Sequence, residues 1–194
     1  MFSFSIAKKS SNFADRMVEL KDASLSVGGK SLFKHLSMIA HQGQITCVTG
    51  GAGSGKTLLL RVMLGYVALD EGLINIDGEL LTALSADFFR RMMAYVPQRV
   101  GPRYTGFVPD TGDLETVWGG GQWLYYDSKP IEMPVVMVQD KPIVIVDDPD
   151  VTFLGQLKSL ANDGKTVIIA SNKEEFLNMS DKVIFLENND GVLY

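Results

Sequence analysis

A glycine-rich run of eight residues constrains this chain more than any other feature of its sequence. Residues 50–57 read Gly-Gly-Ala-Gly-Ser-Gly-Lys-Thr and match the pattern G-x-x-x-x-G-K-[ST] in full. Glycine has no Cβ, so consecutive backbone N–H groups in such a run can turn toward one anion. The lysine adds a positive charge for the β- and γ-phosphates, and the threonine hydroxyl can bind Mg²⁺. The run predicts a nucleoside triphosphate site built from Gly50, Gly51, Ala52, Gly53, Ser54, Gly55, Lys56 and Thr57.

The segments on either side of this glycine loop have the structure that such a site requires. Residues 45–49 are apolar and rich in β-branched side chains, which is typical of a strand buried on both faces of a parallel sheet. Residues 57–64 favour a helix, and Gly65 is well placed to end it. A helix that begins at the loop directs the positive end of its dipole toward the phosphates. The alternative, a glycine turn with an incidental lysine, does not account for this strand–loop–helix order.

Two adjacent aspartates follow a second buried strand. Residues 143–146 read Ile-Val-Ile-Val, and Asp147 and Asp148 come directly after them. Ligands of open α/β sheets gather at the carboxyl ends of the strands, so Asp147 should meet the glycine loop there. We expect Asp147 to take part in the Mg²⁺ site. Asp148 stands where a carboxylate could orient or deprotonate an attacking water, although it could equally be an acidic turn residue.

The remaining pattern of strands and helices predicts an α/β fold with a mostly parallel central sheet and an antiparallel β part near the N-terminus. The further elements expected are strands at 17–27, 32–40, 166–170, 183–186 and 192–194, a hairpin at 72–81, and helices at 85–93, 153–161 and 173–179. The helix at 85–93 is expected to begin with Ser85 as its cap and to bury Phe88, Phe89, Met92 and Met93.

Composition limits the classes of protein to which the chain can belong. Its 194 residues suit one domain, at 17–194, after an extension at 1–16. The formal net charge of -5 argues against a nucleic-acid partner, because such binders carry an excess of basic residues. The single cysteine, Cys47, excludes an intramolecular disulfide and fits a reducing compartment. No apolar run approaches the roughly 18 residues of a membrane span, so we expect any work at a membrane to need a partner.

Several segments, taken in order, resemble those of ABC-type ATPases, the ATP-binding subunits of ABC transporters. Residues 69–78 are similar to the hairpin after the family's phosphate loop, residues 94–98 (Ala-Tyr-Val-Pro-Gln) to its Q-loop, and residues 167–175 to its switch region. The resemblance covers about residues 17–194. It implies a P-loop NTPase fold with ATP and Mg²⁺ as ligands. It further implies that Gln98 senses Mg²⁺ and the γ-phosphate, and that Asn172 takes the place of the switch histidine that contacts the γ-phosphate.

The resemblance also implies partners and a location. Two such domains would pair head to tail, as two copies of this chain or as this chain with a different one, on the cytoplasmic face of a membrane-spanning transporter subunit. Each ATP would then lie between one glycine loop and the partner's signature loop. The best counterpart of that signature here is the degenerate segment at 118–122, Trp-Gly-Gly-Gly-Gln.

The chain departs from the family pattern at further points. Asp148 replaces the usual glutamate and is one methylene shorter, and Val27 stands where an aromatic residue usually stacks on adenine. Asn172 can donate a hydrogen bond but cannot become positively charged. Gln98 and Asp147 are 49 positions apart (147 − 98), which is short for the family. We therefore expect a reduced or remodelled helical subdomain at 99–134.

Three functions remain open from the sequence. The chain could be an ATPase coupled to a membrane partner, or a catalytically weak ATP-binding switch or scaffold, as its substituted catalytic positions suggest. It could also be a P-loop kinase for a small molecule that uses arginines as lid charges, although we expect the first two of these, on a helix, to be solvated: Arg90, Arg91, Arg99 and Arg103. The choice between ATP and GTP and the transported cargo are not encoded in these motifs.

Overall fold

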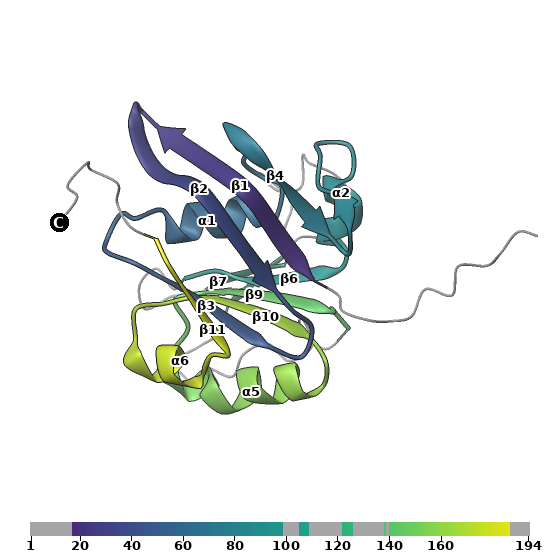
Figure 1. Cartoon of the computed structure of the whole chain (residues 1–194). Coiled ribbons are helices and arrows are strands. Elements are labelled where there is room, and N and C mark those ends of the chain that lie inside the picture. Colours follow the sequence, from purple (N-terminus) through teal and green to yellow (C-terminus); the bar gives the residue numbers. More distant parts are fainter. Residues whose placement is uncertain (1–16, 99–104, 109–121, 126–137, 139, 187–194) are drawn as a thin grey trace, which may run out of the picture.

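The structure is a computed structural model that describes residues 17–98, 105–108, 122–125, 138 and 140–186. Its elements form four layers (Figure 1). An antiparallel sheet lies over helix α1 (Lys56–Met63), and a parallel sheet lies beneath that helix. Helices α5 (Leu154–Asn162) and α6 (Glu174–Met179) cover the other face of the parallel sheet. The predicted α/β architecture is confirmed.

The parallel sheet contains the strand that precedes the glycine loop and the strand that precedes the two aspartates. Its order is β11-β3-β10-β9-β6, and every neighbouring pair is parallel. Three strands are buried along their whole length, as their apolar runs predict. The strands are β3 (Ile45–Thr49), β6 (Met93–Val96), β9 (Ile143–Asp147), β10 (Thr166–Ala170) and β11 (Lys182–Phe185).

The antiparallel sheet has the order β2-β1-β4-β5 and is built from two hairpins. Asp77 and Gly78, with φ of 54° and 82°, join β4 to β5 as a tight two-residue turn. The pairing of β1 with β2 is irregular near Asp22 and His35, whose side chains form an ion pair at 2.8 Å. The strands are β1 (Val18–Val27), β2 (Lys30–Ala40), β4 (Glu71–Ile76) and β5 (Glu79–Leu80).

Alternate residues of the parallel strands belong to two hydrophobic cores. Ile143 and Ile145 pack into the core around α1 and the antiparallel sheet. Val144 and Val146 pack into the core under α5 and α6, which includes Phe176. A short 3-10 helix, η1 (Val151–Phe153), leads into α5. Because both faces are packed, the sheet holds the carboxyl ends of β3, β9 and β10 in fixed positions.

The helix predicted at 85–93 is shorter than expected. α2 spans Ala86–Arg90, and Met93 is the first residue of β6. Ser85 does not cap the helix with its side chain; its hydroxyl donates instead to the Leu80 carbonyl at 2.9 Å. Phe89 is buried as predicted, but Phe88 is 63% exposed, because a five-residue helix has room to bury little more than one face.

Several expectations fall on segments that the structure does not describe. These are the extension at 1–16, the strand at 192–194 and most of the stretch at 99–134. Within that stretch, for which we expected a reduced or remodelled helical subdomain, the described residues form an antiparallel strand pair, β7 (Thr105–Val108) with β8 (Gln122–Tyr125). Of the signature-like segment, only Gln122 is described. No helix in the described part of the chain is long and apolar enough to cross a membrane.

Candidate functional site

The glycine loop connects the carboxyl end of β3 to the first turn of α1. Gly50 has a φ of 153°, and a Cβ on it would come within 2.5 Å of the Leu186 carbonyl oxygen. Gly55 has a φ of 92° and precedes the helix. Both are conformations that residues with a side chain rarely adopt. Gly50 and Gly55 are therefore needed to pass the chain close to the end of β11 and into the helix.

The loop presents positive charge and free amides. The Lys56 Nζ donates to the carbonyl oxygens of Gly50 at 2.6 Å and Gly51 at 3.0 Å, so the ammonium group lies across the loop. Among the described residues no side chain caps the N-terminus of α1. The first N–H groups of a helix have no partner within it, and the dipole adds partial positive charge there. This end of α1 fits a phosphate group.

A cavity of about 690 Å³ adjoins the loop and brings together the predicted site residues except Gly50 and Gly51, which do not line it. Ligand pockets typically measure about 300–1,000 Å³, so the volume suits a nucleotide. Residues 52–58 line one side of the cavity, and Gln98, Asp147, Asp148 and residues 171–173 line the other. Val27, the counterpart of the adenine-stacking residue, is 53% exposed and is not among the described residues that line it, whereas Leu32 is.

Asp147 is the last residue of β9 and is only 4% exposed. Burial raises the pKa of its carboxyl group; the hydrogen bond from the Thr57 side chain opposes this rise, and the nearby negative charge of Asp148 adds to it. The Tyr95 hydroxyl lies 3.5 Å from the Asp147 Oδ2. A buried carboxylate joined to a hydroxyl is an oxygen donor pair of the kind that Mg²⁺ prefers.

The described residues contain no group of three or more acidic, histidine or cysteine side chains that could hold a metal on its own. Magnesium commonly binds through one or two protein groups together with substrate phosphates. Thr57 and Asp147 fit that arrangement, since both line the cavity beside the glycine loop.

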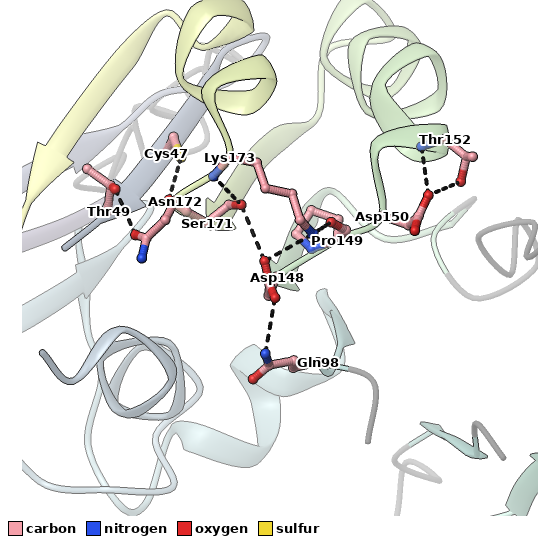
Figure 2. A network of polar contacts seen from close by, with 10 residues as sticks. All are labelled: Cys47, Thr49, Gln98, Asp148, Pro149, Asp150, Thr152, Ser171, Asn172 and Lys173. Carbon is pink, nitrogen blue, oxygen red and sulfur yellow. Dashed lines mark hydrogen bonds and ion pairs between the residues drawn. The ribbon is translucent and has the colours of Figure 1, made fainter. Parts of the chain in front are cut away.

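Asp148 lies one residue beyond β9 in a left-handed conformation, with a φ of 43°. Figure 2 shows that donors from two other segments converge on its carboxylate. The Gln98 Nε2 donates to Oδ2 at 3.1 Å, the Ser171 hydroxyl donates to Oδ1 at 3.4 Å, and the Lys173 Nζ lies 3.2 Å from Oδ1. The Asp148 side chain thus links the segments after β6, β9 and β10.

Asn172 is tied to the start of the glycine loop. Its Oδ1 accepts hydrogen bonds from the Thr49 hydroxyl at 2.9 Å and from the Gly50 N–H at 3.1 Å. With the oxygen held, the amide nitrogen is the part of this side chain that is left to face a ligand (Figure 2). A side chain that donates a hydrogen bond without carrying a charge is what the replacement of histidine by Asn172 predicts.

The structure also reveals site residues that the sequence analysis missed. The sequence analysis assigned no role to Ser171, Lys173 or Thr49, because each acts in this network through a contact with a residue distant in sequence or on another loop. Lys173 could have attracted notice as the one basic side chain in the segment Ser-Asn-Lys-Glu-Glu, directly after the switch position.

The arginines of the kinase alternative do not form a group over the cavity in the described part of the chain. Arg90 is not solvated as expected: its side chain is 10% exposed, donates to the Leu64 carbonyl and lies over the ring of Tyr66. Arg91 is exposed and absent from the cavity lining. Arg99 and Arg103 lie outside the described residues.

A parallel sheet, a glycine loop at a helix start and a carboxylate at the end of a neighbouring strand define a P-loop NTPase. Comparisons with known proteins narrow the class. A family model described as ABC transporter matches residues 33–118. The chain has the fold of a solved nucleotide-free ATP-binding cassette from an ABC transporter, with a TM-score of 0.66 and 16% identity over 89% of this chain and 88% of that one. These comparisons assign the fold to the ATP-binding cassettes, and residues 33–118 match the ABC transporter family.

Curated relatives agree with this assignment. Over 69 residues the chain is 39% identical to MlaF, the intermembrane phospholipid transport system ATP-binding protein of Escherichia coli (strain K12). These residues make up 36% of this chain and 26% of MlaF. It is 25% identical to the spermidine/putrescine import ATP-binding protein PotA of Haemophilus ducreyi, over 88% of this chain and 55% of PotA. It is 26% identical to the petrobactin import ATP-binding protein YclP of Bacillus subtilis, over 89% of this chain and 84% of YclP. The matches to MlaF and PotA thus span about a quarter and about half of those proteins.

Proposed function

We propose that this chain binds Mg-ATP in the cavity beside the glycine loop and hydrolyses it as the ATP-binding subunit of a transporter. The single observation that carries the proposal is the meeting of an uncapped helix end, the Lys56 ammonium group and the buried Asp147 carboxylate on one cavity of about 690 Å³. Hydrogen-bond donors for an anion beside a carboxylate–hydroxyl pair suit a triphosphate with its metal ion, whereas the donors alone or the pair alone would suit a simpler ligand.

The binding roles follow from position. Backbone N–H groups within residues 51–57 and the Lys56 ammonium group would hold the phosphates, with Lys56 exchanging its two loop carbonyls for phosphate oxygens. Thr57, Asp147 and Gln98 would hold Mg²⁺, which neutralises charge on the β- and γ-phosphates when bound. Asn172 would donate its amide hydrogens toward the γ-phosphate, since its oxygen is already engaged by Thr49 and Gly50.

Asp148 would serve as the general base. In hydrolysis, the oxygen of a water forms a bond to the γ-phosphorus while the bond from that phosphorus to the β,γ-bridging oxygen breaks, and the water gives a proton to the Asp148 carboxylate. The products are ADP and inorganic phosphate. The Gln98 amide, 3.1 Å from the Asp148 Oδ2, lies where it can also orient the water.

The partners belong to the same proposal. The relatives named above take part in transport of phospholipid or in import of polyamine or petrobactin, and what they share is ATP binding. A like or unlike second cassette and a membrane-spanning subunit on its cytoplasmic side would complete such a system. A solved relative of the same fold is described as an ABC exporter with ATP bound.

A second candidate function is a slow ATP-binding switch. The observation that favours it is the double occupation of the Asp148 carboxylate, whose two oxygens already accept from Gln98 and from Ser171 and pair with Lys173. A short side chain so engaged could reach the water poorly, and a displacement of about 1 Å can cost on the order of 10²-fold in rate.

Steady-state phosphate release with Mg-ATP separates the two candidates. The ATPase function predicts sustained turnover by the wild type and its loss in Asp148→Asn, with binding of a fluorescent ATP analogue retained. The switch function predicts little turnover by the wild type and a gain of about 10-fold or more in the double variant Asp148→Glu with Asn172→His. Turnover that survives in Asp148→Asn would exclude the assignment of the base.

A further inference from the structure

We propose that Lys173 is a positioning residue for hydrolysis, which acts by fixing the carboxylate of Asp148. The inference rests on the proposed function and deepens it, because it assigns a role in the ATPase reaction to a side chain that the sequence analysis did not single out. Lys173 follows the switch position Asn172 and stands at the N-cap of α6. It lines the same cavity as the glycine loop.

The ammonium group of Lys173 is held at one place. The Nζ is 3.2 Å from the Asp148 Oδ1 and donates to the carbonyl oxygen of Pro149, so it grips two successive residues of the loop after β9 (Figure 2). It also lies over the ring of the buried Phe176, 5.9 Å from the ring centroid. The Lys173 N–H donates to the Ser171 hydroxyl at 3.2 Å, which fixes the backbone from which the side chain extends.

These contacts define the orientation of the Asp148 carboxylate. Lys173 holds Oδ1 from the side of β10, and Gln98 holds Oδ2 from the side of β6. Cationic and amide donors on different oxygens fix the plane of the group; because Ser171 also donates to Oδ1, the lone pair that is left for a water is on Oδ2. Asp148 needs such support because it is a short side chain on a loop, in a backbone conformation that residues other than glycine rarely adopt.

Loss of this ion pair should lower kcat and change the free energy of unfolding little. Both side chains are 37% exposed, and ion pairs that are open to water contribute little to the free energy of unfolding. General bases, by contrast, lose rate steeply when they are displaced by about 1 Å. The Lys173 ammonium group also donates to the Pro149 carbonyl, so two of its three N–H donors are engaged by the loop after β9.

The test uses Lys173→Met, which keeps an unbranched side chain one atom shorter and removes its charge, and Lys173→Arg, which restores a cation. Lys158→Met is the matched control, since Lys158 is exposed on α5 and does not line the cavity. We measure kcat by phosphate release and the Kd of a fluorescent ATP analogue with Mg²⁺. The expected result for Lys173→Met is a fall in kcat of about 10- to 100-fold with the Kd unchanged. Lys173→Arg should recover most of the rate, and Lys158→Met should match the wild type.

A second arm repeats Lys173→Met in the Asp148→Asn background. If Lys173 acts through Asp148, the added substitution causes no further loss of rate. A further loss there, or a Kd that weakens in parallel with kcat, would show that Lys173 contacts the nucleotide itself and would overturn the inference. An unchanged kcat in Lys173→Met alone would also overturn the inference. A raised kcat would overturn it as well, because the ion pair would then hinder Asp148 as the base.

The two proposals fail in distinguishable ways. A wild-type chain that binds no Mg-ATP removes the proposed function itself. A wild-type chain that binds Mg-ATP but releases no phosphate leaves the nucleotide site in place and overturns the role of Lys173 in hydrolysis.

Discussion

The two sides of the cavity are built in different ways. The glycine-loop side consists of backbone amides, one ammonium group and glycines that a packed strand end requires. The opposite side consists of side chains on the loops after β6, β9 and β10, which reach one another through Gln98, Asp148 and Lys173. A backbone cradle allows few substitutions, whereas a side-chain network can change one member at a time. This difference explains why the loop matches its motif in full while the departures Asp148 and Asn172 collect on the other side.

The largest effect should come from Lys56, whose ammonium group lies across the glycine loop. Lys56→Ala should weaken binding of a fluorescent ATP analogue by about 100-fold or more, because truncation of a charge in a paired binding contact typically costs about 2–5 kcal/mol. Lys158→Ala, which removes a distant exposed lysine, is the control. Equal affinity in Lys56→Ala and the wild type would remove the distinction between the two sides of the cavity.

The glycines test whether the loop side depends on backbone shape. Gly50→Ala should lower the free energy of unfolding by about 1–3 kcal/mol, because its Cβ would meet the Leu186 carbonyl at 2.5 Å and the Ser54 Oγ at 2.7 Å. Gly51→Ala is the matched control, since a Cβ there has nothing within 4 Å. Urea unfolding of the two variants makes the measurement. Equal loss of stability in both would contradict the geometry of the loop.

A smaller effect concerns Asp147 on the metal side. A protonated carboxyl cannot hold Mg²⁺, and burial raises the pKa of Asp147, so the proton returns at a higher pH than in an ordinary aspartate. The Mg²⁺-dependent part of ATP affinity should therefore weaken a few-fold as the pH falls from about 7 to about 5.

Asp147→Asn provides the control for protonation of the nucleotide itself. It should weaken the Mg²⁺ dependence more than the nucleotide affinity and should lose the protein's part of the pH effect. An identical pH profile in the variant and the wild type, measured by titration of Mg²⁺ against bound analogue, would falsify the role of Asp147 in the metal site.

Much of the fold was predictable because buried runs and turns leave local signals. The strands β3, β9 and β10 are short apolar runs that cannot be read as amphipathic elements, and Asp77-Gly78 is a turn in sequence and structure. The helix at 85–93 was predicted too long, because the apolar pair Met92 and Met93 continues a helical spacing that the chain ends by entering β6. Tertiary pairing with β9 decides that boundary, and no local pattern encodes it.

The site residues also fall into those that local sequence predicts and those that tertiary structure decides. The loop, Asp147 and their meeting at the strand ends follow from motif and topology. The contacts of Asp148 with Lys173, and of Asn172 with Thr49, depend on which parallel strands are neighbours and on rotamers set by packing. The left-handed backbone at Asp148 has no sequence signal either, since aspartate is common in ordinary turns.

Titration calorimetry of the purified chain with Mg-ATP, and separately with Mg-GTP, tests the central claim most directly. The account predicts saturable heat with one site per chain for Mg-ATP, abolished in Lys56→Ala and retained in Lys158→Ala. The absence of any binding heat with either nucleotide at concentrations of about 1 mM, where a ligand bound by about 4 kcal/mol would be detected, would contradict it.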